Sequence, residues 1–221
     1  MSKKKRKRNE HKHEGFIFIG INGTTGKFQK LTNQDKSNED FLSFLKCLDG
    51  RAEQSSIPVE KGSGKYPYVN FKKNIADDFK QQFEKHKQRK KIIPIGYSFG
   101  ARALSLMGGD DIVNVAAYVF LSPPPTPSRK PSEKVREEDD QNWERSFKQV
   151  STPCLYICGE KCDKKLRKAH AEKKLMNINP KSKVVEIKSC DSIFRPVIDG
   201  ATKANVQEEI ASEINQWVET L

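Results

Sequence analysis

The segment that most constrains this chain is a short turn between two predicted elements. Residues 96–100 read Gly-Tyr-Ser-Phe-Gly, directly after the apolar run of residues 92–95 and directly before a helical pattern that begins at Ala101. A strand that enters a helix through Gly-x-Ser-x-Gly holds its serine in a strained turn, so the positions two residues to either side must be small. Gly96 and Gly100 meet that requirement around Ser98. The order of these elements predicts a serine presented at the end of a central strand.

Strand and helix patterns alternate along the rest of the chain. Short apolar or β-branched runs predict strands over residues 16–21, 55–59, 91–95, 113–121, 154–158 and 183–188. Helical spacing predicts helices over 39–48, 69–87, 98–107 and 164–176, one within 126–149, and a last one carrying Val206, Ile210, Ile214, Trp217 and Leu221. Strands that are apolar on both faces indicate a mainly parallel sheet with helices on both faces. With the turn at 96–100, the pattern predicts a compact α/β-hydrolase-like three-layer sandwich over residues 15–221.

The formal net charge of +12 is unevenly distributed along the chain. Six of these charges come from consecutive residues, Lys3, Lys4, Lys5, Arg6, Lys7 and Arg8. Such a run cannot be buried, so residues 1–14 are expected to form a disordered basic tail. The run matches a short nuclear import signal; a solubilising tail and a weak hook for nucleic acid are the alternatives. We therefore expect a nuclear location, with the cytoplasm as the alternative.

Neither a membrane protein nor a secreted protein is expected. No apolar stretch approaches the length of a membrane span, and the N-terminus lacks the apolar region of a secretory signal. Five cysteines, an odd number without such a signal, favour reduced thiols. Cys154, Cys158 and Cys162 recur every four residues, but the first two fall in a predicted strand, where even spacing puts both on one buried face. We expect neither a metal site nor a cofactor.

Ser98 is the candidate nucleophile. When a serine in such a turn attacks a carbonyl, the oxyanion is stabilised by the N–H of the next residue and by one from a loop after an early strand. These donors would be Phe99 and, in the glycine-rich loop 22–26, Thr24. The acid of a triad should follow at the end of a later strand, which makes Asp163 the candidate and Glu160 a less favoured substitute. Asp163 is equally suited to cap the helix that follows it.

The histidine that should complete a triad is missing from its expected place. Residues 188–196, which follow the last predicted strand, contain no histidine. The only histidine after Ser98 is His170, about two turns into a predicted helix that would lie beside the sheet and away from the strand ends. Asp191 is a poor substitute, because the proton affinity of a carboxylate is far below that of the alkoxide that forms when serine gives up its proton. Since loss of one triad member lowers the rate by several orders of magnitude, the sequence predicts an incomplete catalytic constellation.

These residues resemble the dienelactone-hydrolase-like branch of the α/β-hydrolases, which includes the testis-expressed hydrolase-like proteins and the third subunit of the nonspecific-lethal histone acetyltransferase complex. The similarity runs from residue 16 to residue 221. It is carried by Gly-Tyr-Ser-Phe-Gly-Ala-Arg-Ala at 96–103, by Asn-Gly-Thr-Thr-Gly at 22–26 in place of a His-Gly-x-Gly-Gly loop, by Val-Arg-Glu-Glu at 135–138 with the run 153–159, and by Ile-Lys-Ser-Cys-Asp-Ser at 187–192. Asp191 stands where the family has its histidine, and a shift of one residue puts Ser192 there instead. Asp163 lies one residue later than the family's acid.

The resemblance implies protein partners in a nuclear, chromatin-associated assembly, because some members of the family are better known as parts of nuclear assemblies than as enzymes. We therefore expect a hydrolase-fold protein with impaired catalysis that acts as a nuclear interaction or scaffold subunit. The alternative is a serine hydrolase for a small ester or thioester, with its base supplied by His170, a partner chain or an unusual arrangement. Nucleic-acid binding through the tail and basic helices is a weaker third hypothesis, since no aromatic-basic surface pattern accompanies the charge.

Overall fold

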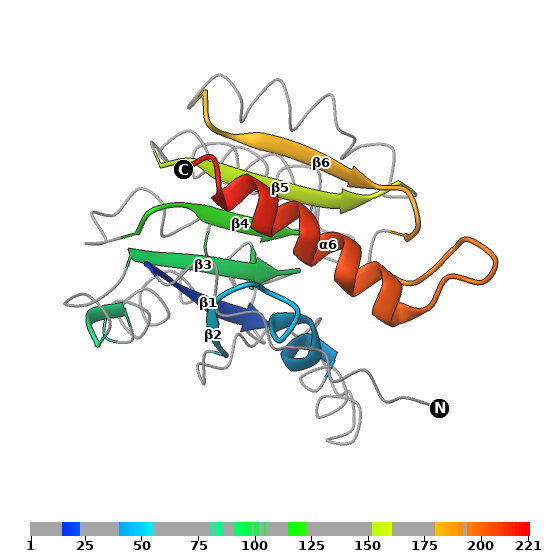
Figure 1. Cartoon of the computed structure of the whole chain (residues 1–221), viewed down its shortest axis with the longest axis horizontal. Helices are drawn as coiled ribbons and strands as arrows, with labels where there is room; N and C mark the ends of the chain where they lie inside the picture. Colours follow the sequence, from blue (N-terminus) through cyan, green and yellow to red (C-terminus); the bar gives the residue numbers. More distant parts are fainter. Residues whose placement is uncertain are drawn as a thin grey trace, which may run out of the picture.

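In the described part of the chain, six parallel strands form one sheet at the centre of the fold. The computed structural model describes residues 15–22, 40–54, 81, 83–85, 91–98, 100–101, 104, 115–122, 152–160, 180–191 and 194–221. In sequence order the strands are β1 (Phe16–Asn22), β2 (Arg51–Gln54), β3 (Lys91–Tyr97), β4 (Tyr118–Leu121), β5 (Cys154–Gly159) and β6 (Lys183–Ile187). Their spatial order is β2-β1-β3-β4-β5-β6, so β3 is a central strand (Figure 1). The predicted parallel sheet is confirmed.

One strand was not predicted, and another differs from its predicted bounds. The strand predicted over 55–59 lies outside the described residues, and β2, for which no strand was predicted, lies at one edge of the described sheet and pairs with β1, at Ile17 with Arg51 and onward. An edge strand needs no apolar run on both faces, so its polar sequence carried no signal. β4 begins later than predicted, at Tyr118, although Val115 already makes one parallel bridge with Ile92.

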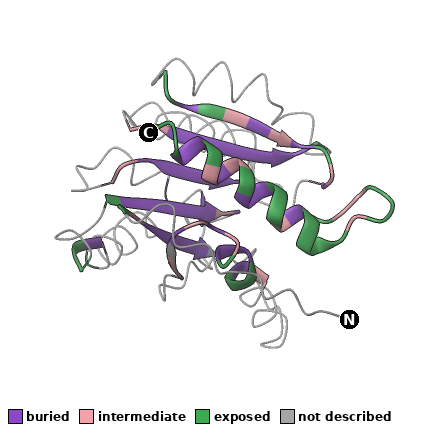
Figure 2. Cartoon of the chain, viewed as in Figure 1, coloured by how far each residue is buried: buried purple, intermediate pink, exposed green. Residues whose placement is uncertain are grey.

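Both faces of the sheet are covered. One face packs Phe18, Ile93 and Val119 into a cluster with the helix of residues 40–45 and with the last helix, α6 (Lys203–Val218). Residues of the other parity, among them Ile19 and Phe120, are also fully buried, so the second face is covered as well. Figure 2 shows β1, β3, β4 and β5 buried along nearly their whole length, whereas β6 is buried only at Val185 and Ile187. Burial on both faces explains why the strands read as continuous apolar runs.

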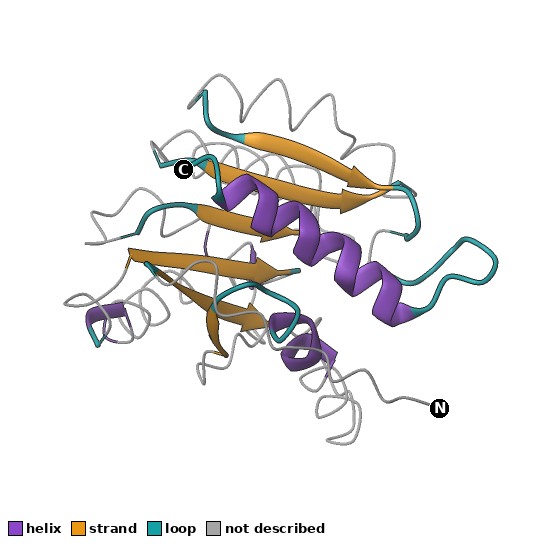
Figure 3. Cartoon of the chain, viewed as in Figure 1, coloured by secondary structure: helices purple, strands orange, loops and turns teal. Residues whose placement is uncertain are grey.

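Helix α6 lies across one face and contacts β5 and β6 (Figures 1 and 3). Thr202 caps its N-terminus: the Thr202 side chain accepts from the Asn205 N–H, and the Asn205 side chain accepts from the Thr202 N–H. This reciprocal cap satisfies backbone donors that the first turn leaves without partners. The predicted stripe is confirmed, since Val206, Ile210, Ile214 and Trp217 are buried and Leu221 is half-buried.

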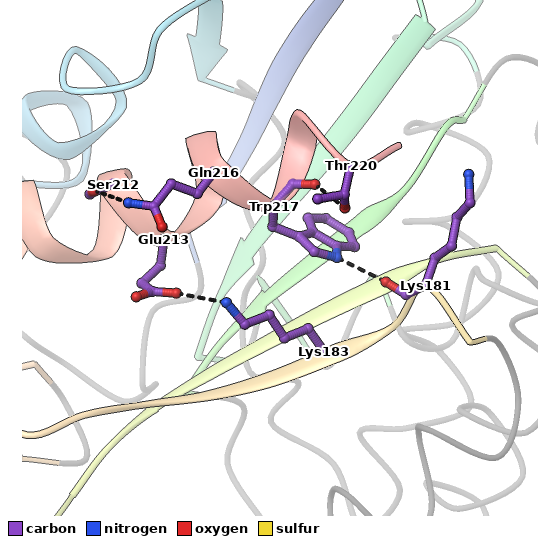
Figure 4. Close-up of polar contacts among 7 residues, drawn as sticks. All are labelled: Lys181, Lys183, Ser212, Glu213, Gln216, Trp217 and Thr220. Carbon is purple, nitrogen blue, oxygen red and sulfur yellow. Dashed lines mark hydrogen bonds and ion pairs between the residues drawn. The ribbon is translucent and has the colours of Figure 1, made fainter.

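Polar contacts at the C-terminal half of α6 fasten it to the sheet (Figure 4). The Trp217 Nε1–H donates to the carbonyl of Lys181 at 2.9 Å, just before β6. Lys183 pairs with Glu213, with Nζ and Oε2 3.1 Å apart. At the other end of α6, Lys203 pairs with Asp40, which ties α6 to the helix of residues 40–45. The apolar stripe and these contacts hold α6 against one face of the sheet.

Several sequence predictions lie outside the described residues. These are the basic tail 1–14 and the helices predicted within 126–149 and over 164–176. Of the helix predicted over 98–107, residues 100, 101 and 104 are described and are helical, whereas Ser98, the predicted first residue, is a turn residue with a φ of 53°. In the described part of the chain, no helix has the length and apolar character that a bilayer span needs.

Candidate active site

The backbone around Ser98 is a sharp turn at the end of β3. Ser98 has a φ of 53°, in the left-handed region that side chains other than glycine rarely adopt. Its two glycine neighbours lie against other backbone: a Cβ on Gly96 would lie 2.4 Å from Ala101 Cα, and one on Gly100 would lie 2.1 Å from the Ile21 carbonyl oxygen. Neither position has room for a side chain, as the Gly-x-Ser-x-Gly pattern requires.

The N–H of Ser98 extends the sheet by one hydrogen bond. It donates to the Leu121 carbonyl of β4 at 2.9 Å, and only 8% of Ser98 is exposed. Because this N–H is already used, an oxyanion would need the N–H of the following residue, as the sequence predicts. Phe99 and Thr24, the predicted donors, lie outside the described residues.

The ends of the neighbouring strands continue this pattern. The Ser122 N–H donates to the Ile157 carbonyl at 2.8 Å, and the Glu160 N–H donates to the Ile187 carbonyl at 3.0 Å. Ser122 is buried and has a φ of 44°, so a second left-handed serine ends the strand next to Ser98. The sequence singled out neither its conformation nor its position, because a serine before a proline run reads only as a strand end.

The loop between β6 and α6 lies back across the strand ends. A Cβ on Gly159, the last residue of β5, would lie 2.0 Å from the Asp191 carbonyl oxygen, so the two backbones are in direct contact. Farther along the loop, the Phe194 ring stacks on the Tyr97 ring at a centroid distance of 5.9 Å. Tyr97 precedes Ser98, and the loop therefore reaches from β6 to the end of β3. In a complete triad this loop would carry the histidine.

The Asp191 side chain is paired with Arg195 in the same loop. Its Oδ1 accepts from the Arg195 backbone N–H at 2.9 Å, and its Oδ2 accepts from Arg195 Nε at 2.8 Å. The Asp191 N–H donates in turn to the Arg195 carbonyl at 2.9 Å, and Phe194 between them has a φ of 59°. Where the resemblance predicts a histidine, the structure therefore has an ion-paired aspartate. Ser192, the alternative position, lies outside the described residues.

Tyr97 stacks with two aromatic rings beside the elbow. Its ring centroid is 6.2 Å from that of Phe41 and 5.9 Å from that of Phe194. Burial, and secondly the negative charge of Asp191, raise the pKa of Tyr97 to about 12. Tyr97 therefore stays protonated at neutral pH and does not offer a base to Ser98.

Of the other candidates for the triad, the structure describes only Glu160. Glu160 is described and exposed at the end of β5, whereas Asp163 and all four histidines of the chain, His170 included, fall outside. Cys154 and Cys158 are buried on one face of β5, as predicted, and burial raises the pKa of the Cys154 thiol to about 12. Within the described ranges, no three His, Cys, Asp or Glu residues are grouped so that they could hold a metal ion.

The chain is similar in structure to several solved proteins at low sequence identity. Est1E from Butyrivibrio proteoclasticus, solved with ferulic acid bound, is 13% identical, with a TM-score of 0.61 over 94% of this chain and 90% of that one. MenH from S. aureus is 13% identical, with a TM-score of 0.61 over 94% of each chain. A lipase-esterase related protein from Clostridium acetobutylicum is 15% identical, with a TM-score of 0.61 over 92% of this chain and 95% of that one.

No protein-family model and no curated protein sequence matches the chain. At identities this low, the structural similarities speak for the fold. They agree with the six-stranded parallel sheet, the strained serine at the end of its central strand β3 and the loop that returns from β6. The chain has the α/β-hydrolase fold.

Proposed function

We propose that the chain is a serine hydrolase for a small ester or thioester, with Ser98 as its nucleophile. The left-handed backbone of Ser98, with a φ of 53°, is the observation that carries the proposal. A left-handed conformation costs an L-residue about 1–2 kcal/mol, and glycine would adopt it without that cost. A pure scaffold would be more stable with glycine here, whereas nucleophilic chemistry requires the hydroxyl. The fold shared with Est1E and the lipase-esterase related protein supports ester chemistry.

In the proposed reaction, Ser98 Oγ attacks the acyl carbonyl carbon while its proton passes to a base. The alcohol or thiol takes up that proton and leaves, and water then hydrolyses the acyl-serine to the carboxylic acid and restores the hydroxyl. Phe99 and Thr24 remain the proposed oxyanion donors, and Asp163 the proposed acid of the triad. Because Asp191 is bound to Arg195, we propose that the base is His170 or a group from a partner chain.

A fluorophosphonate probe tests the proposal directly, because it forms a covalent bond only with a nucleophilic serine. We expect the wild-type chain to be labelled and Ser98→Ala to be unlabelled. Ser182→Ala is the matched control: Ser182 is also buried, but its Oγ accepts from the Cys154 N–H at 3.0 Å, at the opposite ends of β5 and β6. Ser182→Ala should keep the label. Absence of label on the wild type, or label that persists in Ser98→Ala, contradicts the proposal.

The Asp191–Arg195 pair favours a second candidate function. A loop that delivers an ion-paired aspartate instead of a histidine suits a catalytically impaired protein of the dienelactone-hydrolase-like branch, acting as a nuclear interaction or scaffold subunit. This function predicts stoichiometric protein partners on purification from cells, together with a wild-type chain that the probe does not label. It also predicts that deletion of residues 1–8 abolishes nuclear import; a deleted chain that stays nuclear would remove the import signal from the proposal.

A further inference from the structure

A second strained serine lies beside the elbow. Ser122 ends β4 with a φ of 44°, and only 8% of the residue is exposed. The register of β3 and β4 pairs Tyr97 with Leu121, so Ser98 and Ser122 occupy the next facing positions at the ends of the two strands. Adjacent strands lie about 4.8 Å apart, so the backbones of the two serines lie side by side at the same edge of the sheet.

The backbone of Ser122 is unfavourable for a serine on two counts. The left-handed region is disfavoured for any residue with a Cβ, and glycine would relieve that strain. Pro123 follows in the sequence, and a residue before proline favours an extended backbone. Strained residues other than glycine persist where the side chain itself is needed, and they cluster at functional sites. The same reasoning applies to Ser98, one strand away.

The peptide unit between Leu121 and Ser122 connects the elbow to the rest of the sheet. Its carbonyl oxygen accepts from the Ser98 N–H at 2.9 Å, and its N–H donates to the Ile157 carbonyl at 2.8 Å. The φ of Ser122 sets how the chain leaves this peptide plane. Any loosening at Ser122 is therefore transmitted to the nucleophile through the hydrogen bond between Leu121 and Ser98.

We propose that Ser122 is a positioning residue for the Ser98 nucleophile. Its proposed role is to keep the left-handed end of β4 in place, so that the Leu121 carbonyl directly before that end stays within 2.9 Å of the Ser98 N–H. This inference rests on the proposed serine hydrolase function and adds a residue to its site. Because misplacement of a reacting group by about 1 Å lowers rates by roughly a hundredfold, a looser elbow should be visible in kinetics even where the fold is intact.

Two substitutions separate the hydroxyl from the backbone strain. Ser122→Ala removes the hydroxyl and keeps the strain, whereas Ser122→Gly removes both. The test measures the rate constant and the binding constant for labelling of Ser98 by a fluorophosphonate, together with the Tm of each full-length variant. We expect both variants to lower the rate constant by about tenfold or more, with the binding constant within about twofold of wild type. Ser122→Gly should melt no lower than Ser122→Ala.

The outcomes are distinct. A folded Ser122→Ala and a folded Ser122→Gly that both label at the wild-type rate overturn the inference and leave the proposed function standing. A Ser122→Gly that labels normally while Ser122→Ala does not shows a purely conformational role and also overturns it. A wild-type chain that does not label overturns the proposed function and this inference with it. Ser182→Ala, a buried serine away from these strand ends, should lower the Tm without changing the rate constant.

Discussion

Replacing Gly159 with alanine should displace the loop after β6 from the end of β5. A Cβ on Gly159 would lie 2.0 Å from the Asp191 carbonyl oxygen, 2.5 Å from the Asp191 carbonyl carbon and 2.7 Å from the Cys190 carbonyl oxygen. Real Cβ atoms essentially never come within 3.0 Å of such atoms, so the two backbones must separate by about 1 Å. No flexible side chain is present at this contact to absorb the shift.

The expected loss of stability follows from this contact. Overpacking typically costs about 1–3 kcal/mol, and a clash between two backbones belongs at about 2–3 kcal/mol. Since about 1 kcal/mol shifts the Tm of a chain of this size by roughly 2–4 °C, Gly159→Ala should lower the Tm by about 4–12 °C. Gly15→Ala is the matched control, because a Cβ there meets no atom within 4 Å. It should raise stability slightly, by about 0.4–1 kcal/mol, by restricting the unfolded chain.

Thermal unfolding followed by circular dichroism measures both variants, and amide hydrogen exchange locates the effect. The Asp191 and Phe194 N–H groups, which are hydrogen-bonded within the loop, should exchange faster in Gly159→Ala, whereas those in the middle of β3 should not. If Gly159→Ala melts within about 1 °C of Gly15→Ala, the loop does not pack on β5, and the inferred path of the loop back to Ser98 is wrong.

Two further predictions concern groups beside the elbow. Tyr97→Phe should remove a loss of stability at high pH. The pKa of Tyr97 is raised from 10.0 to about 12 in the folded chain, so between these pH values the folded chain keeps a proton that the unfolded chain releases. The free energy of unfolding therefore falls as the pH rises from 10 to 12 and is unaffected below that range. Urea unfolding at pH 8 and pH 11 checks this, and equal losses in wild type and variant would contradict it. Asp191→Asn should lower the free energy of unfolding by about 1–3 kcal/mol, because the Asp191 side chain is only 14% exposed and its charged oxygens accept from both the backbone N–H and the side chain of Arg195, and it should leave Ser98 labelling unchanged. A large fall in labelling would show that Asp191 serves as the base.

The sheet could be predicted because its signal is local. Strands β1, β3 and β5 are buried on both faces and stand out as apolar runs between turns. The edge strand β2 was not predicted, because Arg51–Gln54 owes its conformation to pairing with β1 rather than to an apolar pattern of its own. The elbow also has a local signal, because its two glycines fall within one short stretch of the sequence: Gly96 must be small because it lies against Ala101, while Gly100 lies against Ile21 of β1.

The rest of the site depends on contacts between distant segments. The left-handed φ of Ser122 occurs where the Ser122 N–H donates to Ile157 and the preceding Leu121 carbonyl accepts from Ser98, and nothing in the sequence around Ser122 indicates it. The pairing of Asp191 with Arg195 goes with a left-handed turn at Phe194. Bulky aromatic residues rarely adopt this conformation, so the sequence does not predict the turn. Phe99, Thr24, Asp163 and His170 lie outside the described residues and remain predictions from the sequence alone.

The loop after β6 is the segment that would supply a base to Ser98. A triad needs this loop to bring a proton acceptor to the serine, and its path is suitable, since it packs on Gly159 and stacks Phe194 on Tyr97. What it brings is a carboxylate whose two oxygens are bound by Arg195. The strained turn at Ser98, the proposed nucleophile, lies at the end of β3, while this loop supplies no histidine. Any reactivity of Ser98 must take its base from another segment or from a partner chain. Labelling lost in His170→Ala points to the first source, and labelling that appears only when a partner is added points to the second.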